Sequence, residues 1–392
     1  MTRLASYLFV EPLDVLVLRG NKLFGDPGSF GESLVPPWPS VAAGAIRSAL
    51  LARKNIVEGY AKGAVEDPEL GRPQKPGPFR ILDFCLARWR DNGGVELLRP
   101  VPADVVVRQT GTGAFEALRM RPIRLAETIQ SSAVTSHHAV LAERERAKPV
   151  GGLWLTAEGW KAYLRGQEVG SKAHLVKSAD LWSLDARVGV GLDPVRRSAA
   201  EGQLFTVQAV ALRKRYHVKG DPCDVGFLVQ LEGAQLPEQM TLRFGGDGRV
   251  AIATVVPPPD TTDFLDEVVS RRRCRVVLVS PGLFTHGWLP NGARPDERRE
   301  DGAIPFFLHG VSGWIVCAAL PRYEVVSGWD LAQWQPKPAH RAVPAGAVYW
   351  LDELDASTQA LHKLAAEGLW SDPPENALRR AEGFNRIAIA KY

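Results

Sequence analysis

A glycine-containing turn that enters a short apolar strand occurs twice in this 392-residue chain, and this repeat restricts the possible folds more than any other feature. Residues 246–253 read GDGRVAIA and residues 383–390 read GFNRIAIA, and the two agree at the first Gly, the Arg, both Ala and the Ile. Glycine next to a strand pattern marks a tight connection. The repeat therefore predicts two units of the same kind, each closed by a strand that begins at this turn.

The order of the predicted elements supports this division. An apolar strand is predicted near residues 6–18, and a helix is predicted from Ser40, which follows a proline and precedes an apolar face, as a helix N-cap would. A second opening strand is predicted at residues 275–280, and a helix over 353–368 precedes the second glycine turn. Each half thus opens and closes with a strand, which is typical of βαββαβ units.

We therefore expect an α+β protein with two ferredoxin-like, RRM-like domains. The Pro-Pro-Pro run at 257–259 is a natural linker, so the predicted domains are residues 1–257 and 258–392. The first domain is much the longer, which predicts long insertions in it.

The composition, 45% hydrophobic and 23% charged, is that of an ordinary globular protein. The apolar runs are far shorter than the roughly 20 residues of a membrane span, and the N-terminal residues lack a signal-peptide pattern, so we expect no membrane contact and a cytoplasmic location. The four cysteines show no CxxC spacing, which predicts buried thiols rather than a zinc site or disulfides, and we expect no cofactor or metal. Of the 48 basic residues 35 are arginine, the side chain better suited to phosphate, which favours nucleic acid as a partner.

The two turns are candidate phosphate contacts. Glycine allows positive φ and leaves backbone N–H groups accessible to an anion, and an arginine follows each turn. Asn385 stands where Gly248 stands in the first turn, and Asn tolerates the same left-handed backbone, so the first turn is the better candidate. The competing interpretation is that both turns are only tight connections. The candidate residues are Gly245, Gly246, Gly248, Arg249, Gly383, Phe384, Asn385 and Arg386.

Several further blocks, taken in their order along the chain, resemble the RAMP family of CRISPR proteins. They are RGNKLFG (19–25), PPWPSVAAGAIRSALL (36–51), GGLWLT (151–156), RVGVGLD (187–193), RRSAAEGQLFTV (196–207), SPGLF (280–284) and VPAGAVYWL (343–351). Within that family they are most similar to the third numbered subunit of the type III-B Cmr effector complex. The resemblance covers nearly the whole chain.

The resemblance implies a non-catalytic subunit that holds the 5′ repeat-derived tag of the crRNA. It also implies two protein partners, the large polymerase/cyclase-like subunit and the repeated backbone subunit, with target RNA contacted only indirectly. An inserted hairpin or thumb that reaches along the guide RNA is expected as well.

Four segments are candidates for holding single-stranded RNA. Three of them combine charges, amides or aromatic rings, and the start of the predicted helix offers free backbone N–H groups to a phosphate. The third segment, residues 127–148, is the expected place of the thumb. Each segment also has a competing interpretation, which is, in order along the chain, a surface loop, packing against the sheet, a salt-bridged surface helix and a solvated turn. The candidate residues are Arg19, Asn21, Lys22 and Phe24 in the first segment, Ser40, Gly44 and Arg47 at the helix start, His137 and His138 in the predicted thumb, and Arg196, Arg197, Gly202 and Gln203 in the block nearest the tag.

Two other functions remain open at this stage. Some RAMP relatives are metal-independent endoribonucleases that process repeat RNA, and such chemistry needs a histidine near a cation. Only His137, His138 and His217 with Arg215 and Lys219 suggest such a site, and their spacing does not support it, so we expect no catalytic residues. A scaffold that contacts only protein is the other alternative.

Overall fold

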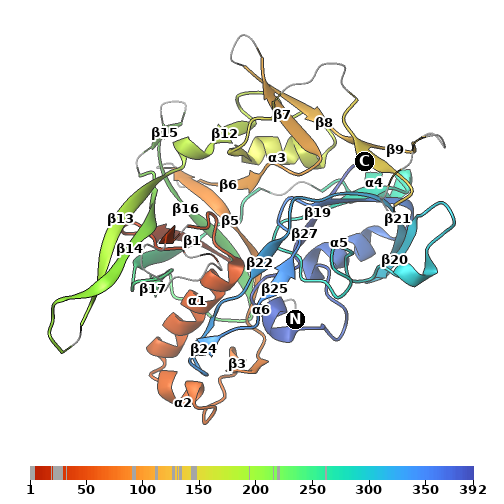
Figure 1. The fold of residues 1–392 in the computed structure, drawn as a ribbon. Helices are drawn as coiled ribbons and strands as arrows, with labels where there is room; N and C mark the ends of the chain where they lie inside the picture. Colours follow the sequence, from red (N-terminus) through yellow and green to blue (C-terminus); the bar gives the residue numbers. More distant parts are fainter. Residues whose placement is uncertain are drawn as a thin grey trace. The chain divides into compact units, whose positions relative to one another are not determined.

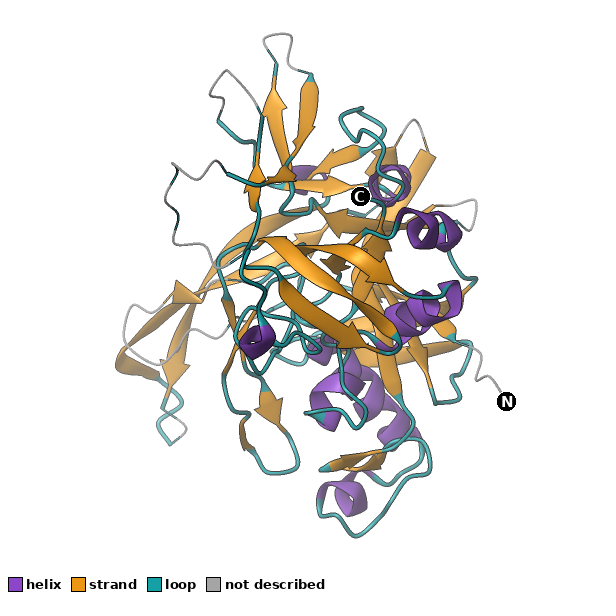
Figure 2. Cartoon of the chain, turned by 90° about the vertical axis from the view of Figure 1, so that its right-hand side faces the viewer, coloured by secondary structure: helices purple, strands orange, loops and turns teal. Residues whose placement is uncertain are grey.

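The computed structural model describes residues 5–18, 20, 30–31, 33–90, 94–110, 114–125, 129, 131, 135–142, 148–193, 195–214, 216–218, 221–260 and 263–392. The chain is a mixed, strand-rich α/β protein (Figures 1 and 2). Its residues form two compact units built from interleaved segments. Unit 1 contains Met1–Glu96, Ala179–Pro259 and Val325–His340, and unit 2 contains Leu97–Ser178, Asp260–Glu324 and Arg341–Tyr392.

The predicted boundary near residue 257 lies close to the unit boundary at 259. In the contact-based division, however, residues 97–178 group with the C-terminal segments. The division into domains 1–257 and 258–392 stays a prediction.

Unit 1 is organised around one antiparallel sheet in the order β5-β16-β1-β18-β17, and β15 pairs with β16. Its elements are β1 (Ser6–Pro12), β2 (Phe30–Gly31), α1 (Pro39–Arg53), α2 (Val57–Ala61), β3 (Gly71–Arg72), β4 (Lys75–Pro76), β5 (Arg80–Arg90), β13 (Trp182–Leu192), β14 (Ala199–Leu212), β15 (Tyr216–Val218), β16 (Asp221–Glu232), β17 (Gln239–Arg243), β18 (Val250–Val256), β23 (Trp329–Asp330) and β24 (Gln335–Pro336).

Helix α1 packs on this sheet against β5 and β17. Its buried face consists of small and aliphatic side chains, among them Ala42, Ala43 and Ile46, which let the helix approach the strands closely. The helix begins one residue before the predicted N-cap: Pro39 is its first residue, a position that proline favours, and Trp38 is the N-cap. Ser40 is therefore the second helical residue, and the prediction that it caps the helix was wrong.

The antiparallel hairpin of β13 and β14 extends away from the sheet of unit 1 (Figure 1). Among its described residues, exposed aliphatic side chains include Leu184, Val188, Val190, Leu192, Val195 and Leu204. The long inserted hairpin of the chain is thus formed by residues 182–212. The segment interpreted as a thumb, 127–148, lies partly outside the described residues, and its described part contributes the short strand β10.

Unit 2 contains a five-stranded sheet in the order β20-β21-β26-β19-β27, and β11 pairs with β12 and with the end of β6. Its elements are β6 (Val95–Pro100, whose first two residues belong to unit 1), β7 (Val105–Gln109), β8 (Phe115–Arg119), β9 (Arg121–Ile123), β10 (His138–Val140), β11 (Leu153–Leu155), α3 (Ala157–Leu164), β12 (Leu175–Lys177), the 3-10 helix η1 (Ser178–Asp180, which starts at the unit boundary), α4 (Leu265–Arg271), β19 (Cys274–Leu278), the 3-10 helix η2 (Pro295–Glu297), β20 (Ile304–Leu308), β21 (Val311–Ala319), β26 (Val348–Asp355), α5 (Thr358–Glu367), α6 (Ala377–Ala381) and β27 (Ile387–Ala390); β22 (Glu324–Val326) and β25 (His340–Ala342) lie at unit boundaries.

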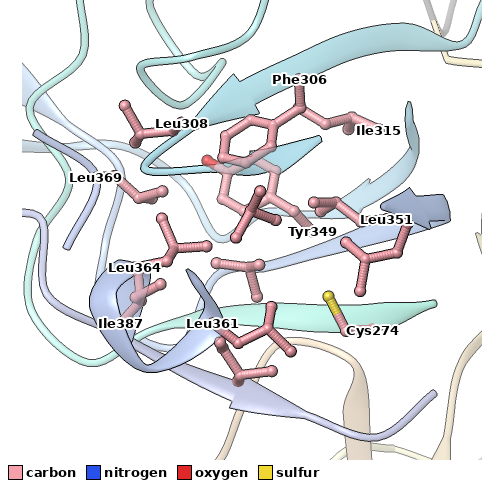
Figure 3. Close-up of a cluster of buried hydrophobic side chains, with 14 of the residues drawn as sticks. Cys274, Phe306, Leu308, Ile315, Tyr349, Leu351, Leu361, Leu364, Leu369 and Ile387 are labelled. Atoms are coloured by element: carbon pink, nitrogen blue, oxygen red, sulfur yellow. The ribbon is translucent and has the colours of Figure 1, made fainter. Parts of the chain in front are cut away.

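Both faces of the five-stranded sheet are buried. Side chains from alternate positions of β19, such as Val276 and Leu278, belong to one core with Leu265 of α4 and with Leu361 of α5. Figure 3 shows Cys274, at the start of the same strand, in this core with Leu361 and Leu364. Val277 faces the opposite way and packs with residues of the inserted segment 97–178. The two-residue period of a strand thus places successive residues in two different cores.

Strand pairing decides the local structure of two segments. The segment after Pro237 forms β17, because its alternating residues Met240 and Leu242 are buried and its backbone pairs with β18. The helix expected from residue 353 begins at Thr358, because β26 continues to Asp355 as the partner of β21.

The prediction of buried thiols is confirmed, since all four cysteines are buried and none of them forms a disulfide. Within the described ranges, every helix is too short or too polar to span a lipid bilayer.

Candidate nucleic-acid interface

The first glycine turn joins β17 to β18 in unit 1. Its left-handed positions are Gly245 (φ 83°), Asp247 (φ 55°) and Gly248 (φ 65°). The ring of Phe244, which is fully buried and stacks on Phe227, fixes the start of the turn. Residues 247 and 248 are exposed.

A close approach requires one glycine of this turn. A Cβ on Gly245 would lie 2.8 Å from the carbonyl of Val17, so only glycine fits there. The N–H of Gly246 donates to the same carbonyl at 2.8 Å, a bond that any residue except proline could make. The space around Gly248 is open, because nothing lies within 4 Å of the place its Cβ would occupy. The tight-connection interpretation therefore explains Gly245, while positive φ is the only requirement at Gly248.

Arg249 stands at the exit of this turn with its side chain 27% exposed. Its Nη1 lies 2.7 Å from Oδ2 of Asp14, a residue that the sequence patterns did not single out. The Nε–H of Arg249 is buried and has no hydrogen-bond partner among the described residues, so a ligand cannot reach it. The partly exposed guanidinium is held in place by one carboxylate, and a phosphate would compete with Asp14 for it.

The chain that leads into the predicted RNA segment 19–25 passes directly beside this turn. Val17 contacts Gly245 and Gly246, and its neighbour Leu16 pairs with Val210 of β14 through two backbone hydrogen bonds of 2.8 Å. After the segment, β2 pairs with β14 in parallel, and the Ser33 hydroxyl donates to the carbonyl of Gln208. Both flanks of this segment are therefore fixed at the base of the hairpin. Arg19, Asn21, Lys22 and Phe24 themselves lie outside the described residues.

Helix α1 begins a few residues further along. The N–H of Leu34 donates to the carbonyl of Leu18 at 2.9 Å, which ties the approach to α1 to the same strand end. A Cβ on Gly44 would meet nothing within 4 Å, so packing does not require glycine there. The guanidinium of Arg47 lies over the ring of Phe79, 5.5 Å from its centroid.

The tip of the hairpin carries Arg196 and Arg197, both exposed. Asp193 shapes the tip, because its carboxylate accepts the N–H of Arg196 at 3.0 Å and its carbonyl accepts the N–H of Arg197 at 2.8 Å. The two arginines lie far from the glycine turn: the stretch of β14 from Ala199 to Thr206 alone is about 23 Å long at 3.3 Å per residue.

Gly202 and Gln203 belong to the part of β14 near the tip. The Gln203 side chain covers Gly191, and the ring of Phe205 covers Gly189, so that a Cβ at either glycine would overlap its neighbour. The hairpin thus presents Arg187, Arg196, Arg197 and a ring. Arg187 was not among the predicted contacts. It lies in a segment whose alternate residues are apolar, a pattern that predicts a strand, and this pattern could have identified it from the sequence.

The second glycine turn differs from the first in its surroundings. The prediction that Asn385 tolerates the left-handed backbone is confirmed, because Asn385 (φ 59°) adopts the same left-handed conformation as Gly248. Gly383, Phe384, Asn385 and Arg386 are all buried, however.

The polar groups of the second turn bind other parts of unit 2. The Asn385 amide donates to the carbonyls of Leu283 and Leu369 at 3.1 and 3.2 Å, and Nη1 of Arg386 donates to the carbonyl of Ala366 at 2.7 Å. This burial argues against the predicted RNA contacts of Phe384, Asn385 and Arg386.

The two predicted thumb histidines lie in unit 2. The N–H of His137 donates to the carbonyl of Val316 at 2.9 Å, and His138 begins β10. Nδ1 of His137 lies 2.9 Å from the Ser136 hydroxyl, and Nε2 of His138 lies 2.7 Å from the Ser131 hydroxyl. Arg215, Lys219 and the side chain of His217 lie outside the described residues.

The glycine turn with Arg249, the flanks of segment 19–25 and the base of the β13–β14 hairpin lie together in unit 1, whereas Arg196 and Arg197 lie at the far end of that hairpin. Exposed arginines and rings on a sheet scaffold are typical of proteins that bind single-stranded nucleic acid. A model of the family described as CRISPR-associated protein (Cas_Cmr3) matches residues 8–392. The chain belongs to this family, which confirms the resemblance inferred from the sequence blocks.

Two solved chains are similar over nearly their whole length. One comes from a cryo-EM structure of the Type III-B Cmr-beta bound to cognate target RNA and AMPPnP; it is 14% identical, with 98% of this chain and 99% of that chain covered and a TM-score of 0.47. The other comes from Type III-B Cmr-beta bound to cognate target RNA; it is 16% identical, with coverage of 97% and 96% and a TM-score of 0.44. No curated protein matches the sequence significantly.

Proposed function

We propose that this protein is a non-catalytic RNA-binding subunit of a type III-B CRISPR effector complex and that it holds the 5′ repeat-derived tag of the crRNA. Family membership supports the assignment to the complex. The observation that carries the RNA contact is the hydrogen bond from Gly246 to Val17, because it places the exposed part of the first glycine turn beside the chain that enters segment 19–25.

The strand orders support a ferredoxin-like origin for both sheets. When β1, β5, β16 and β18 are renumbered 1 to 4 along the chain, their order across the sheet is 4-1-3-2. The strands β19, β21, β26 and β27, renumbered in the same way, have the same order across their sheet. Unit 1 has a helix, α1, after the first of its four strands, whereas unit 2 has a helix, α5, after the third. We propose that each sheet is a βαββαβ unit that lacks one of its two helices, which explains why a glycine turn enters the fourth strand in both.

A tag-holding subunit also bridges proteins. The proposal therefore includes the large polymerase/cyclase-like subunit and the repeated backbone subunit as partners, with target RNA contacted indirectly. A purified chain that binds neither partner would contradict this part of the proposal.

The RNA contact is tested with a labelled crRNA that carries or lacks its 5′ tag. We expect Arg249→Ala to weaken binding of the tagged RNA and to lower the magnitude of the slope of log K against log salt by roughly 0.7, the value for one phosphate on a single strand. Binding is measured by fluorescence anisotropy at four salt concentrations.

Arg53→Ala is the matched control, because Arg53 is an exposed arginine at the opposite end of α1 from Ser40. It should leave both affinity and slope unchanged. Equal affinity and slope for wild type and Arg249→Ala, with folding intact by circular dichroism, would assign the first turn a structural role only.

A further inference from the structure

A cavity lies in unit 2 at the hairpin of β20 and β21. Its volume is about 410 Å³, within the range of sites that hold a small molecule. Side chains on one face of the hairpin line it, in the cross-strand pairs of Pro305 with Trp314 and of Phe307 with Ser312. Two charged residues, Arg294 and Glu353, complete the wall that concerns us here.

The two exposed or partly exposed rings of the cavity have different surroundings. Trp314 packs against the core that contains the inserted segment, and the guanidinium of Arg299 lies over its ring, 4.6 Å from the centroid. The side chain of Phe307 is 53% exposed. One ring is therefore fixed and covered, while the other is open to a flat ligand that stacks on it.

Glu353 reaches the cavity from a strained backbone. Its φ of 52° lies in the left-handed region, which a residue with a long side chain rarely adopts. It lies in β26 where the pairing with β21 shifts its register between Ser312 and Trp314. Such bulges redirect side chains, and they are frequent beside functional sites. Strain of this kind points to a role of the side chain.

The carboxylate of Glu353 is held by one partner and keeps acceptor capacity. Its Oε1 accepts a hydrogen bond from Nη1 of Arg299 at 2.8 Å, and its Oε2 accepts none from the residues that the structure describes. An ionised carboxylate is an acceptor only. The cavity therefore has an oriented acceptor for N–H donors of a ligand.

Arg294 supplies donors to the same cavity. Its backbone is fixed, because its N–H donates to the carbonyl of Pro305 at 2.9 Å. Its side chain is 54% exposed, and Nη1 lies 3.4 Å from Oε2 of Glu297, which is long for a charged hydrogen bond. The guanidinium can thus turn to a ligand. With one cation and one anion in its lining, the cavity suits a flat, neutral ligand that has both donors and acceptors.

We propose that this cavity binds a guanine base, stacked on Phe307 with its Watson–Crick edge toward Glu353. Among the RNA bases, guanine alone presents two adjacent N–H donors, at N1 and N2, to a carboxylate on that edge. Its O6 and N7 are the acceptors that arginine prefers, and Arg294 supplies the matching donors. Adenine offers the carboxylate a single amino group.

The inference goes beyond the proposed function, because the tag contact is proposed for the first glycine turn and segment 19–25 of unit 1, whereas this cavity belongs to unit 2. A guanine base is common to free nucleotides and to RNA, and the experiment separates these two sources.

The test measures binding of guanosine monophosphate (GMP) and adenosine monophosphate (AMP) to the full chain by isothermal titration calorimetry. The two ligands share ribose and phosphate, so a difference in affinity reports the base. We expect GMP to bind about tenfold more tightly or better. Equal affinities, or no binding of either nucleotide at millimolar concentration, would overturn the inference.

Glu353→Gln tests the acceptor, because it replaces one carboxylate oxygen by an N–H donor of the same size. The preference for GMP over AMP should fall to about threefold or less. Glu300→Gln is the matched control, since Glu300 is exposed, lies outside the lining and undergoes the same change of charge. It should keep the preference. An equal loss in both variants would assign the effect to net charge and contradict the proposal.

Phe307→Ala tests the stacking surface. It should weaken GMP and AMP by similar factors of about fivefold or more, because stacking does not distinguish the bases. Unchanged affinity for both nucleotides would remove Phe307 from the site and overturn the proposed pose.

A further variant separates binding from folding. Glu353→Gly relieves the positive φ, so the chain should remain at least as stable to urea while its preference for GMP is lost. A marked loss of stability would show that Glu353 serves the fold, and the inference would fail.

The RNA pentamers UUGUU and UUAUU identify the source of the base. Tighter binding of UUGUU than of GMP, lost in Glu353→Gln, would identify a guanine within an RNA strand, whereas weaker binding would identify a free nucleotide; both results support a guanine site. Tighter binding of UUAUU than of UUGUU would contradict it. Neither measurement uses tagged crRNA, so failure of the proposed tag contact leaves this test unaffected.

Discussion

Several arginines of this chain serve the fold rather than a ligand. The excess of arginine over lysine favoured nucleic acid as a partner, but Arg88, Arg99, Arg275, Arg379 and Arg386 are buried. Part of the arginine content therefore reflects internal hydrogen bonding. Arginine suits such sites because its planar group offers five donors in fixed directions.

Arg275 is the best-connected of these residues in unit 2. Its Nη1 lies 2.6 Å from Oδ2 of Asp104, Nη2 donates to the carbonyl of Tyr163 at 3.0 Å, and Nε donates to the carbonyl of Lys391 at 2.9 Å. The Tyr163 hydroxyl donates to the other Asp104 oxygen at 2.7 Å. This network joins the inserted segment 97–178 to strand β19.

We expect Asp104→Ala to lower the free energy of unfolding by about 3–5 kcal/mol, because it leaves the buried Arg275 charge without its counter-ion. Urea denaturation followed by fluorescence measures the change. Asp185→Ala, which removes an exposed partner of Arg187, is the control and should change stability by less than about 1 kcal/mol. Equal, small effects of both variants would show that Arg275 does not depend on Asp104.

Buried thiols predict a pH dependence of stability. Burial raises the pKa of Cys274 and of Cys317 to about 12, whereas a thiol in an unfolded chain titrates near 8.5, an approximate value. Above roughly pH 8.5 the unfolded chain loses protons that the folded chain keeps. The free energy of unfolding should therefore be unaffected by these thiols below that pH and should fall as pH rises toward 12.

The measurement is urea denaturation at pH 8 and pH 9, below the pKa of about 10 at which tyrosines titrate in an unfolded chain. The expected loss is up to about 1.4 kcal/mol per pH unit for each thiol. The double variant Cys274→Ala, Cys317→Ala should show a smaller fall in the free energy of unfolding between the two pH values, even where its stability at pH 8 is lower than that of wild type. Parallel declines in wild type and variant would contradict the assignment to these cysteines.

Among the elements, the β13–β14 hairpin contributes little to the core beyond its base. Val207, Ala209 and Val210 near the base are buried, whereas Leu192 and Val195 near the tip are exposed. The outer half is therefore available for a ligand, and it carries the predicted RNA contacts Arg196, Arg197, Gly202 and Gln203.

We expect a chain in which residues 189–205 are replaced by Asn-Gly to fold normally, because Val188 and Thr206 are cross-strand partners that a two-residue turn can join. The melting temperature should change little, while affinity for crRNA falls and the salt slope decreases by roughly 1.4, the value for two phosphates. Thermal denaturation and fluorescence anisotropy measure the two effects. Full crRNA affinity in the shortened chain would exclude the hairpin tip from the RNA contact.

The whole molecule is expected to lack nuclease activity. No cluster of His, Cys, Asp and Glu suited to a metal ion is found in the part of the chain that the structure describes. The ring nitrogen Nδ1 of His137 contacts the Ser136 hydroxyl. Absence of catalysis is part of the proposed function.

Incubation of the purified chain with labelled repeat RNA, with and without divalent metal, should give no cleavage above buffer. The product analysis uses denaturing gels. Cleavage that disappears on changing His137, His138 or His217 to Ala would instead support the endoribonuclease alternative.

The sequence by itself determined the features that depend on neighbouring residues. The glycine turns, the strands that follow them, helix α1 and the burial of the cysteines were all predicted from local pattern, and the order of the blocks identified the family. The left-handed backbone shared by Gly248 and Asn385 also follows from local chemistry, since both residue types tolerate positive φ.

Tertiary structure alone decided which of the two similar turns is accessible. The first turn joins β17 to β18 at the edge of its sheet, so Asp247 and Gly248 face solvent. The second turn follows α6, and distant segments around Leu283 and Leu369 cover it and bind the side chain of Asn385. Burial depends on residues far away in sequence, and for this reason two nearly identical local patterns became a surface turn in one unit and a buried one in the other.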